Sequence, residues 1–217
     1  NETLIKTAIT TIFNRIFKTY LKLRLMASES SLLLRKKWSF FFDLMDHDKN
    51  GVWNLKDFVL FSEKIYTIYA VNNYHLDPTE FLYKSRRIFN HLRKDMELES
   101  SHITKEDWIN FLQEKETQPG RKYFRFMVSI ISRELFDVCD QNKDDFLSEH
   151  ELIQLYKMLG LSEETAIEAI DLLDLNKDYR ISKWELYRGI QDFFEDPNKE
   201  ITLFGKVGDL TRTQIMG

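Results

Sequence analysis

Three short segments of the chain repeat one pattern of oxygen-bearing side chains. They read DHDKNGVWNLKD, DQNKDDFLSEHE and DLNKDYRISKWE, and they begin at Asp46, Asp140 and Asp174. In each segment, side chains with oxygen atoms stand at positions 1, 3, 5, 9 and 12, and three of them are carboxylates. Hard divalent cations such as calcium and magnesium prefer oxygen ligands, so this density of oxygens on twelve residues predicts cation sites.

The spacing is that of the EF-hand loop, in which position 7 adds a backbone carbonyl and position 9 acts through water. The predicted ligands of the first loop are Asp46, Asp48, Asn50, the Val52 carbonyl and Asp57. Those of the second matching loop are Asp140, Asn142, Asp144, the Phe146 carbonyl and Glu151. Those of the third are Asp174, Asn176, Asp178, the Arg180 carbonyl and Glu185. One acidic turn is often only a solvated helix connection, but three with the same spacing predict that two to three Ca²⁺ ions bind.

Two positions differ between the loops and should modify their affinities. Position 6 needs a sharp turn at positive φ, which Gly51 adopts freely, whereas Asp145 and Tyr179 occupy it in the later loops. A residue other than glycine costs about 1–2 kcal/mol there. At position 12, Asp57 is one methylene shorter than the usual Glu, which makes Mg²⁺ an alternative occupant of the first site.

Apolar residues at helical spacing flank each loop, so the units read as helix, loop, helix. A degenerate unit, the second of four along the chain, starts at Met96, where Met96, Leu98 and Ser100 replace the front ligands. It keeps an apolar residue, Ile103, at position 8, the position at which two adjacent loops pair as a short antiparallel strand. We therefore expect Trp53 to face Ile103 and Leu147 to face Ile181, with the second hand serving a structural role.

These units predict an all-α fold, a compact arrangement of four EF-hands in two pairs with an extra N-terminal amphipathic helix. The expected segments are a basic helix over 1–27, one pair over 28–115, the other over 116–195, and a tail over 196–217. The helix over 1–27 rests on a stripe of apolar residues at spacings of three and four. That stripe consists of Ile5, Ile9, Ile12, Ile16 and Tyr20.

Charge divides the chain into a basic head and an acidic body. Residues 1–37 carry eight basic and two acidic side chains, a net charge of +6, and the remainder carries 23 basic and 33 acidic ones, a net charge of −10. The basic head could pack on the core, bind an anionic membrane or a protein partner, or direct the chain to an organelle. We expect a monomer with no nucleic-acid partner.

Other features narrow the class of protein. The single cysteine, Cys139, cannot form an intramolecular disulfide, which favours a cytoplasmic location, with peripheral membrane binding or organelle targeting through 1–27 as the alternative. The sequence contains no stretch of about 18 uncharged apolar residues, so it predicts no membrane-spanning helix. The five histidines are scattered and no nucleophile motif or phosphate-binding glycine loop is present, so an enzyme is not expected.

The order of three matching loops and one degenerate loop makes the chain resemble one family of EF-hand proteins. Its members are the sarcoplasmic calcium-binding proteins, calexcitin, the luciferin-binding proteins and the calcium-regulated photoproteins. The resemblance covers about 28–208 and includes the Asp at the end of NGVWNLKD, the TKEDW exit of the second hand and the LFG of the tail. It implies a compact body whose tail packs over the apolar interior, with Ile201, Leu203 and Phe204 as the plug.

The resemblance implies an intracellular calcium-binding protein, either a buffer or a calexcitin-like sensor. Two alternatives remain open: a carrier for an apolar molecule of the coelenterazine type, and an interaction module anchored to a membrane or filament through 1–27. The photoproteins that the chain resembles carry a histidine on the last helix, beside their light-emitting ligand. The last predicted helix here carries Trp184 and Tyr187 but no histidine, which argues against light emission.

Overall fold

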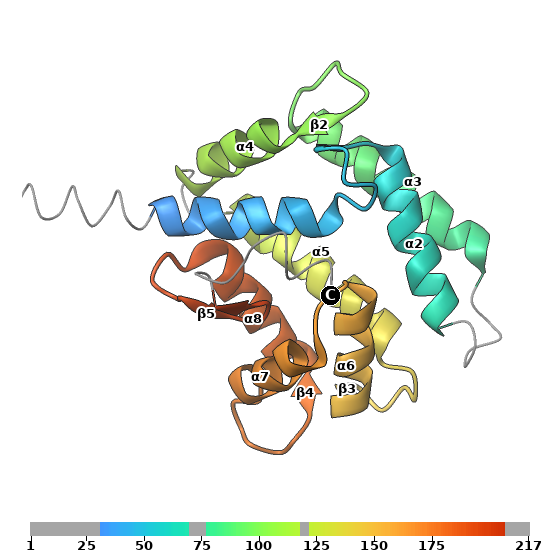
Figure 1. The fold of residues 1–217 in the computed structure, drawn as a ribbon, viewed down its shortest axis with the longest axis vertical. Helices are drawn as coiled ribbons and strands as arrows, with labels where there is room; N and C mark the ends of the chain where they lie inside the picture. The colour runs from blue at the N-terminus through green and yellow to red at the C-terminus, as the bar shows by residue number, and fades with distance from the viewer. Residues whose placement is uncertain (1–30, 70–76, 118–121, 207–217) are drawn as a thin grey trace, which may run out of the picture.

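The structure is a computed structural model that describes residues 31–69, 77–117 and 122–206. Helices dominate the described residues and strands are only two residues long, so the predicted all-α fold is confirmed (Figure 1). The predicted helix over 1–27 and the tail residues 207–217 lie outside the described residues. Among the described helices, none is long and apolar enough to cross a membrane.

Four helix–loop–helix units follow one another along the chain. In the first, a helix described over 31–45 leads through β1(Val52–Trp53) to α2(Leu55–Tyr69). The second contains α3(Pro78–Asp95), β2(Ile103–Thr104) and α4(Lys105–Thr117). The third contains α5(Lys122–Cys139), β3(Phe146–Leu147) and α6(Glu149–Met158), and the fourth contains α7(Glu163–Leu173), β4(Ile181–Ser182) and α8(Lys183–Glu195). A hairpin of β5(Ile201–Thr202) and β6(Gly205–Lys206) follows α8.

The loops pair as the apolar residues at position 8 predict. Strand β1 pairs antiparallel with β2, with Trp53 opposite Ile103. Strand β3 pairs antiparallel with β4, with Leu147 opposite Ile181. All four of these side chains are buried, so each strand pair joins two loops over apolar contact as well as backbone hydrogen bonds. Both predicted cross-loop pairs are confirmed.

Aromatic rings join the two halves of the molecule into one core. Phe41 contacts Trp53 and Trp108 on one side and Phe193 and Phe194 of α8 on the other, with ring centroids 5.1–6.5 Å apart. Because aromatic rings bury large apolar areas, this cluster fixes the helix over 31–45 between hands from both ends of the chain.

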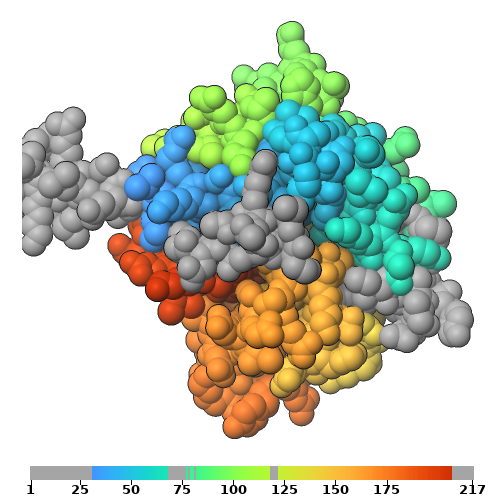
Figure 2. Space-filling model, in the orientation of Figure 1, coloured from blue at the N-terminus to red at the C-terminus, as the bar shows by residue number. Residues whose placement is uncertain are grey.

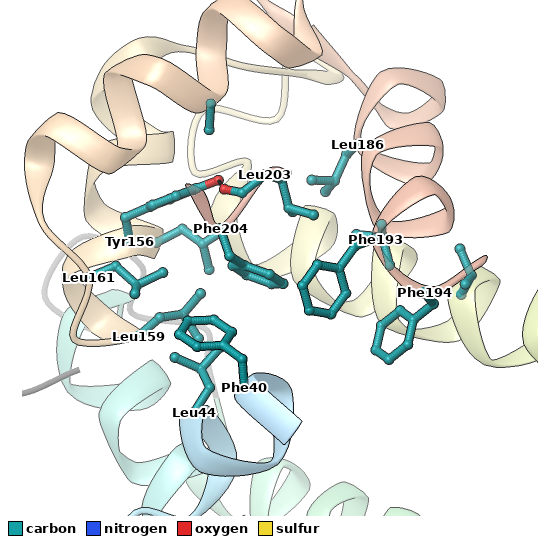
Figure 3. Packing of buried hydrophobic residues seen from close by; sticks show 14 of the residues in the cluster. Phe40, Leu44, Tyr156, Leu159, Leu161, Leu186, Phe193, Phe194, Leu203 and Phe204 are labelled. Carbon is teal, nitrogen blue, oxygen red and sulfur yellow. Dashed lines mark hydrogen bonds between the residues drawn. The ribbon is translucent and has the colours of Figure 1, made fainter. Parts of the chain in front are cut away.

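The tail covers the interior with two of its three predicted residues. Leu203 and Phe204 are buried, and Phe204 points toward Phe40 and Phe193, with ring centroids at 5.9 and 4.8 Å (Figure 3). The prediction for Ile201 is wrong, because its side chain is 57% exposed. Side chains alternate along a strand, so burying Thr202 turns Ile201 to the outer face of the hairpin.

Buried polar groups of the helix over 31–45 find partners in distant elements. The indole N–H of Trp38 donates to the Phe194 carbonyl (3.1 Å), and the indole N–H of Trp108 donates to the Trp38 carbonyl (3.0 Å). Lys37, whose side chain is fully buried, donates from Nζ to the Asp196 carbonyl (2.7 Å). Burial lowers the pKa of Lys37 to about 8, although the charges of Asp196 and Asp192 oppose the shift.

The lowered pKa of Lys37 predicts a pH-dependent stability. Between pH 8 and 10.5 the unfolded chain holds the Lys37 proton while the folded chain loses it, so the free energy of unfolding rises with pH in this window. Urea unfolding of the parent and of Lys37→Met should diverge by about 1–2 kcal/mol between pH 8 and pH 10. A constant difference across this range would contradict the assigned environment of Lys37.

Candidate metal centres

The first loop brings three carboxylates together. One oxygen from each of Asp46, Asp48 and Asp57 lies within 4.8 Å of the others. Asp46 and Asp57 are fully buried. Burial raises the pKa of Asp57 above its usual value, and the charges of Asp48 and Asp46 act in the same direction, while backbone hydrogen bonds act against it. Grouped, buried carboxylates repel one another, and a bound cation would relieve that repulsion.

Backbone N–H groups hold these side chains in a closed loop. The Asp46 carboxylate accepts hydrogen bonds from the N–H of Asn50 (3.2 Å) and of Gly51 (2.9 Å). The Asn50 side-chain oxygen accepts one from the N–H of Val52, the first residue of β1 (2.9 Å). The side-chain oxygens of Asp46 and Asn50 therefore accept hydrogen bonds from the backbone of their own loop.

The last carboxylate joins the two ends of the loop. Asp57 Oδ1 accepts from the N–H of His47 (3.0 Å), and Oδ2 accepts from the N–H of Asn54 (2.9 Å). One side chain of α2 thus contacts the second and the ninth loop residues together. This contact fixes the position of the exit helix relative to the entry helix.

The loop over 140–151 repeats this network. Asp140 accepts from the N–H of Asp144 (3.2 Å) and of Asp145 (3.2 Å), and Asp144 accepts from the N–H of Phe146 (3.0 Å). Glu151 accepts from the N–H of Gln141 (2.8 Å) through Oε1 and from the N–H of Ser148 (2.9 Å) through Oε2. Asp140 and Glu151 are both buried.

The loop over 174–185 has the same contacts at the same positions. Asp174 accepts from the N–H of Asp178 (3.2 Å) and of Tyr179 (2.9 Å). Glu185 accepts from the N–H of Leu175 (3.0 Å) and of Ser182 (2.9 Å). In the two later loops the serine at position 9 also forms a capping box with the glutamate at position 12, which starts α6 and α8.

Position 6 has the backbone conformation expected from the sequence. Its φ is +84° at Gly51, +65° at Asp145 and +63° at Tyr179. In each loop the N–H of this residue donates to the carboxylate at position 1, which explains why the turn is needed. The two residues other than glycine therefore carry backbone strain that Gly51 avoids.

Position 4 is a feature that the sequence reasoning missed. Lys49, Lys143 and Lys177 all have positive φ, between +57° and +61°. The Nζ of each donates to a carbonyl in the last turn of its own entry helix, at 3.1, 2.8 and 3.2 Å. Those carbonyls, which lack helical partners, thus gain a charged donor. The lysine that follows the third residue of every matching loop was the available signal.

The loop over 96–107 lacks these contacts at its front. Met96 and Leu98, at positions 1 and 3, pack against the core. Asp107 accepts from the N–H of Thr104 (2.9 Å) and from its hydroxyl (2.6 Å), so position 12 retains its hold on position 9. The apolar front residues supply packing but no side-chain oxygen.

A lysine at position 10 links the two hands of each pair. Lys105 Nζ lies 2.6 Å from Asp43 Oδ1 and 5.7 Å from the centre of the Phe42 ring. Lys183 Nζ lies 5.2 Å from the centre of the Phe136 ring and 2.8 Å from Asp145 Oδ1. In both pairs the lysine contacts a phenylalanine in the entry helix of the preceding hand. Its short ion pair is with Asp43 of that helix for Lys105, and with Asp145 of the loop for Lys183.

Comparison with known proteins shows the fold. No protein-family model matches the chain. Calerythrin of Saccharopolyspora erythraea is 24% identical over 153 residues, which are 70% of this chain and 86% of calerythrin. Among the solved structures, the coelenterazine-binding protein of Renilla muelleri in its calcium-loaded apo form has a TM-score of 0.61 and 21% identity. That match covers 85% of this chain and 97% of that one.

A Streptomyces coelicolor calcium-binding protein also has a TM-score of 0.61, with 15% identity over 75% of this chain and 98% of its own. These likenesses confirm the EF-hand resemblance at the level of the fold. The candidate ligands of this chain therefore rest on the geometry of its own loops.

The strain at position 6 predicts opposite effects of two substitutions. Gly51→Ala should lower the free energy of unfolding by about 1 kcal/mol, because a Cβ at Gly51 meets no atom within 4 Å and the cost is that of the backbone. Tyr179→Gly should raise it by up to about 1 kcal/mol, since the Tyr179 side chain is 84% exposed and contributes little packing. Urea unfolding measures both changes, and a stabilising Gly51→Ala would refute the assignment.

Proposed function

We propose that the chain binds Ca²⁺ in the loops 46–57, 140–151 and 174–185 and that the loop 96–107 binds none. The observation that carries the proposal is the common network of the three loops, in which the carboxylates at positions 1 and 12 are buried and held by backbone N–H groups. Buried carboxylates held in this way are stabilised by a divalent cation. The likeness to the calcium-loaded coelenterazine-binding protein and to the Streptomyces calcium-binding protein supports this choice of ion.

The proposed ligands are the side chains at positions 1, 3, 5 and 12 and the backbone carbonyls of Val52, Phe146 and Arg180. Val52 and Phe146 open the strands β1 and β3, and Arg180 directly precedes β4, so strand pairing fixes the backbone at position 7 in each loop. Five protein groups, with water at position 9, supply the six or more oxygens that Ca²⁺ requires.

The first site is the one that we propose to accept Mg²⁺ as well. Mg²⁺ is smaller than Ca²⁺ and takes six ligands at shorter distances. Within the described residues, the first loop has the carboxylate cluster in which three oxygens lie within 4.8 Å of one another. The short side chain of Asp57 supports monodentate contact, which leaves room for water.

Of the two roles, buffer and sensor, the packing favours a buffer. A sensor exposes an apolar groove when it binds calcium, whereas a buffer hardly opens. Here Leu203 and Phe204 cover the interior, and rings from hands 1, 2 and 4 contact one another. A groove could open only if these rings separated, which would cost free energy. Binding calcium as a buffer does not require that separation.

The same packing disfavours the carrier alternative. Binding sites for drug-sized ligands enclose about 300–1,000 Å³. A pocket between α7, α8 and β5 has a volume of about 80 Å³ and is lined in part by Leu175, Arg188 and Ile201. An interior ligand would need the aromatic core to rearrange.

The other alternative, anchoring to a membrane or filament through 1–27, depends on residues outside the described ranges.

Calcium titration by calorimetry tests the proposal. The full chain should bind three ions without Mg²⁺, and Glu151→Gln and Glu185→Gln should each remove one, because each loses the carboxylate that closes its loop. Asp107→Asn is the matched control and should leave the stoichiometry unchanged. Fewer than three ions for the parent, or an ion lost in Asp107→Asn, would overturn the assignment.

A hydrophobic dye separates the buffer from the sensor. For a buffer, the fluorescence of the dye should change little when Ca²⁺ is added, because Phe204 stays buried. A strong calcium-dependent rise in dye fluorescence would instead identify a sensor.

Asp57→Glu should shift the ion preference of the first site. The longer side chain reaches the ion with both oxygens, which suits the higher coordination number of Ca²⁺. We expect the ratio of Ca²⁺ to Mg²⁺ affinity at this site to rise about tenfold, measured by calcium titration with and without Mg²⁺. Glu151→Asp, the reverse exchange, should lower the ratio at its own site. An unchanged ratio in both variants would rule out a role for side-chain length.

A further inference from the structure

Two adjacent residues of the helix over 31–45 donate hydrogen bonds to carbonyls at the end of α8. Lys37 Nζ donates to the Asp196 carbonyl at 2.7 Å, and Trp38 Nε1 donates to the Phe194 carbonyl at 3.1 Å. Both side chains are buried, with exposed fractions of 0% and 1%. In the space-filling view, the same helix (blue) lies between α4 (green) and the segment after α8 (red) (Figure 2). We call the pair Lys37 and Trp38, with the two carbonyls that they bind, the clasp.

Helix α8 connects the clasp to the fourth loop. Glu185, which closes the loop over 174–185, lies in the first turn of α8, and Phe194 lies in its last turn. They are nine positions apart along the α-helix, or about 14 Å at 1.5 Å per residue. A helix of this length moves as a unit, so a displacement of Glu185 moves the carbonyls that the clasp holds.

The opposite end of the helix over 31–45 leads into the first loop. The Phe42 carbonyl accepts the N–H of Asp46 (3.0 Å) and the indole N–H of Trp53 (2.9 Å). Asp46 is position 1 of the first loop, and Trp53 is position 8. The helix therefore contacts the first loop at its C-terminal end and the hand 4 exit helix nearer its N-terminal end.

Ring contacts support the same path. Phe41 lies 5.1 Å from Phe194 and 6.2 Å from Trp53 between ring centroids. A close-packed interior transmits a displacement rather than absorbing it. A movement of α8 should therefore displace the first loop through ring packing as well as through the hydrogen bonds of the clasp.

We propose that Lys37 and Trp38 are positioning residues that couple cation binding in the loop 174–185 to cation binding in the loop 46–57. The inference rests on the proposed function of these loops and adds a thermodynamic link between hands 1 and 4, which belong to different pairs. A cation that draws Glu185 inward shifts α8, the clasp carries the shift to the helix over 31–45, and Asp46 changes position. By linkage, a cation in the first loop changes the affinity of the fourth loop by the same factor.

The test measures the coupling between the two sites in full-length protein. Glu151→Gln silences the loop 140–151 and leaves a two-site parent. Adding Glu185→Gln or Asp57→Asn to this parent gives the two single-site proteins. Calcium calorimetry on the three proteins yields the coupling factor, which we expect to be about fivefold or more. Trp38→Phe, which keeps an aromatic side chain but removes the N–H donor, and Lys37→Met should each bring the factor close to one while the single-site affinities change less than threefold.

Lys199→Met is the matched control. Lys199 follows α8, which ends at Glu195, and its Nζ pairs with Asp192 of that helix rather than with the helix over 31–45. This variant should keep the coupling factor of the parent. A factor near one in the parent, or one that survives both Trp38→Phe and Lys37→Met, would overturn the inference. Single-site proteins that bind no calcium would instead refute the proposed function itself, so the two failures are distinct.

Discussion

The carboxylate at the twelfth loop position is the contact on which the three candidate sites depend. It accepts the N–H of the second loop residue with one oxygen and the N–H of the ninth with the other, in Asp57, Glu151 and Glu185 alike. Because this residue also stands in the first turn of the exit helix, one side chain sets the loop closure and the helix direction together. A hydrogen bond to an ionised carboxylate is stronger than a neutral one, and its burial strengthens it further.

The second hand shows what remains when this contact is incomplete. Asp107 still accepts from Thr104, yet the front of its loop is apolar. Strand β2, Lys105 and Trp108 nevertheless hold the first hand. The hand thus keeps the contacts that position its neighbour and lacks the oxygens that a cation needs, and these two tasks fall on different residues of the same loop.

Periodicity and spacing predicted the parts of the structure that the repeated twelve-residue pattern determines. The loop boundaries, the positive φ at position 6 and the pairs Trp53–Ile103 and Leu147–Ile181 follow from a twelve-residue pattern repeated along the chain. The tail was predicted less well, because the resemblance did not give the alternation that exposes Ile201.

Contacts made by residues outside the repeated pattern could not be predicted in this way. The clasp joins residues 156–159 positions apart, and nothing about Lys37 in the sequence distinguishes it from its neighbour Lys36. Its burial depends on how two helices meet. The lysines at positions 4 and 10 were visible as letters, but their roles required the helix ends and rings that they contact.

A crystal structure of the chain grown with calcium, with the ions located by anomalous scattering, would show which loops hold a cation. We expect one ion in each of the loops 46–57, 140–151 and 174–185, with Asp57, Glu151 and Glu185 as ligands, and none in the loop 96–107. An ion in the loop 96–107, or ordered loops that hold no ion at saturating calcium, would contradict this expectation.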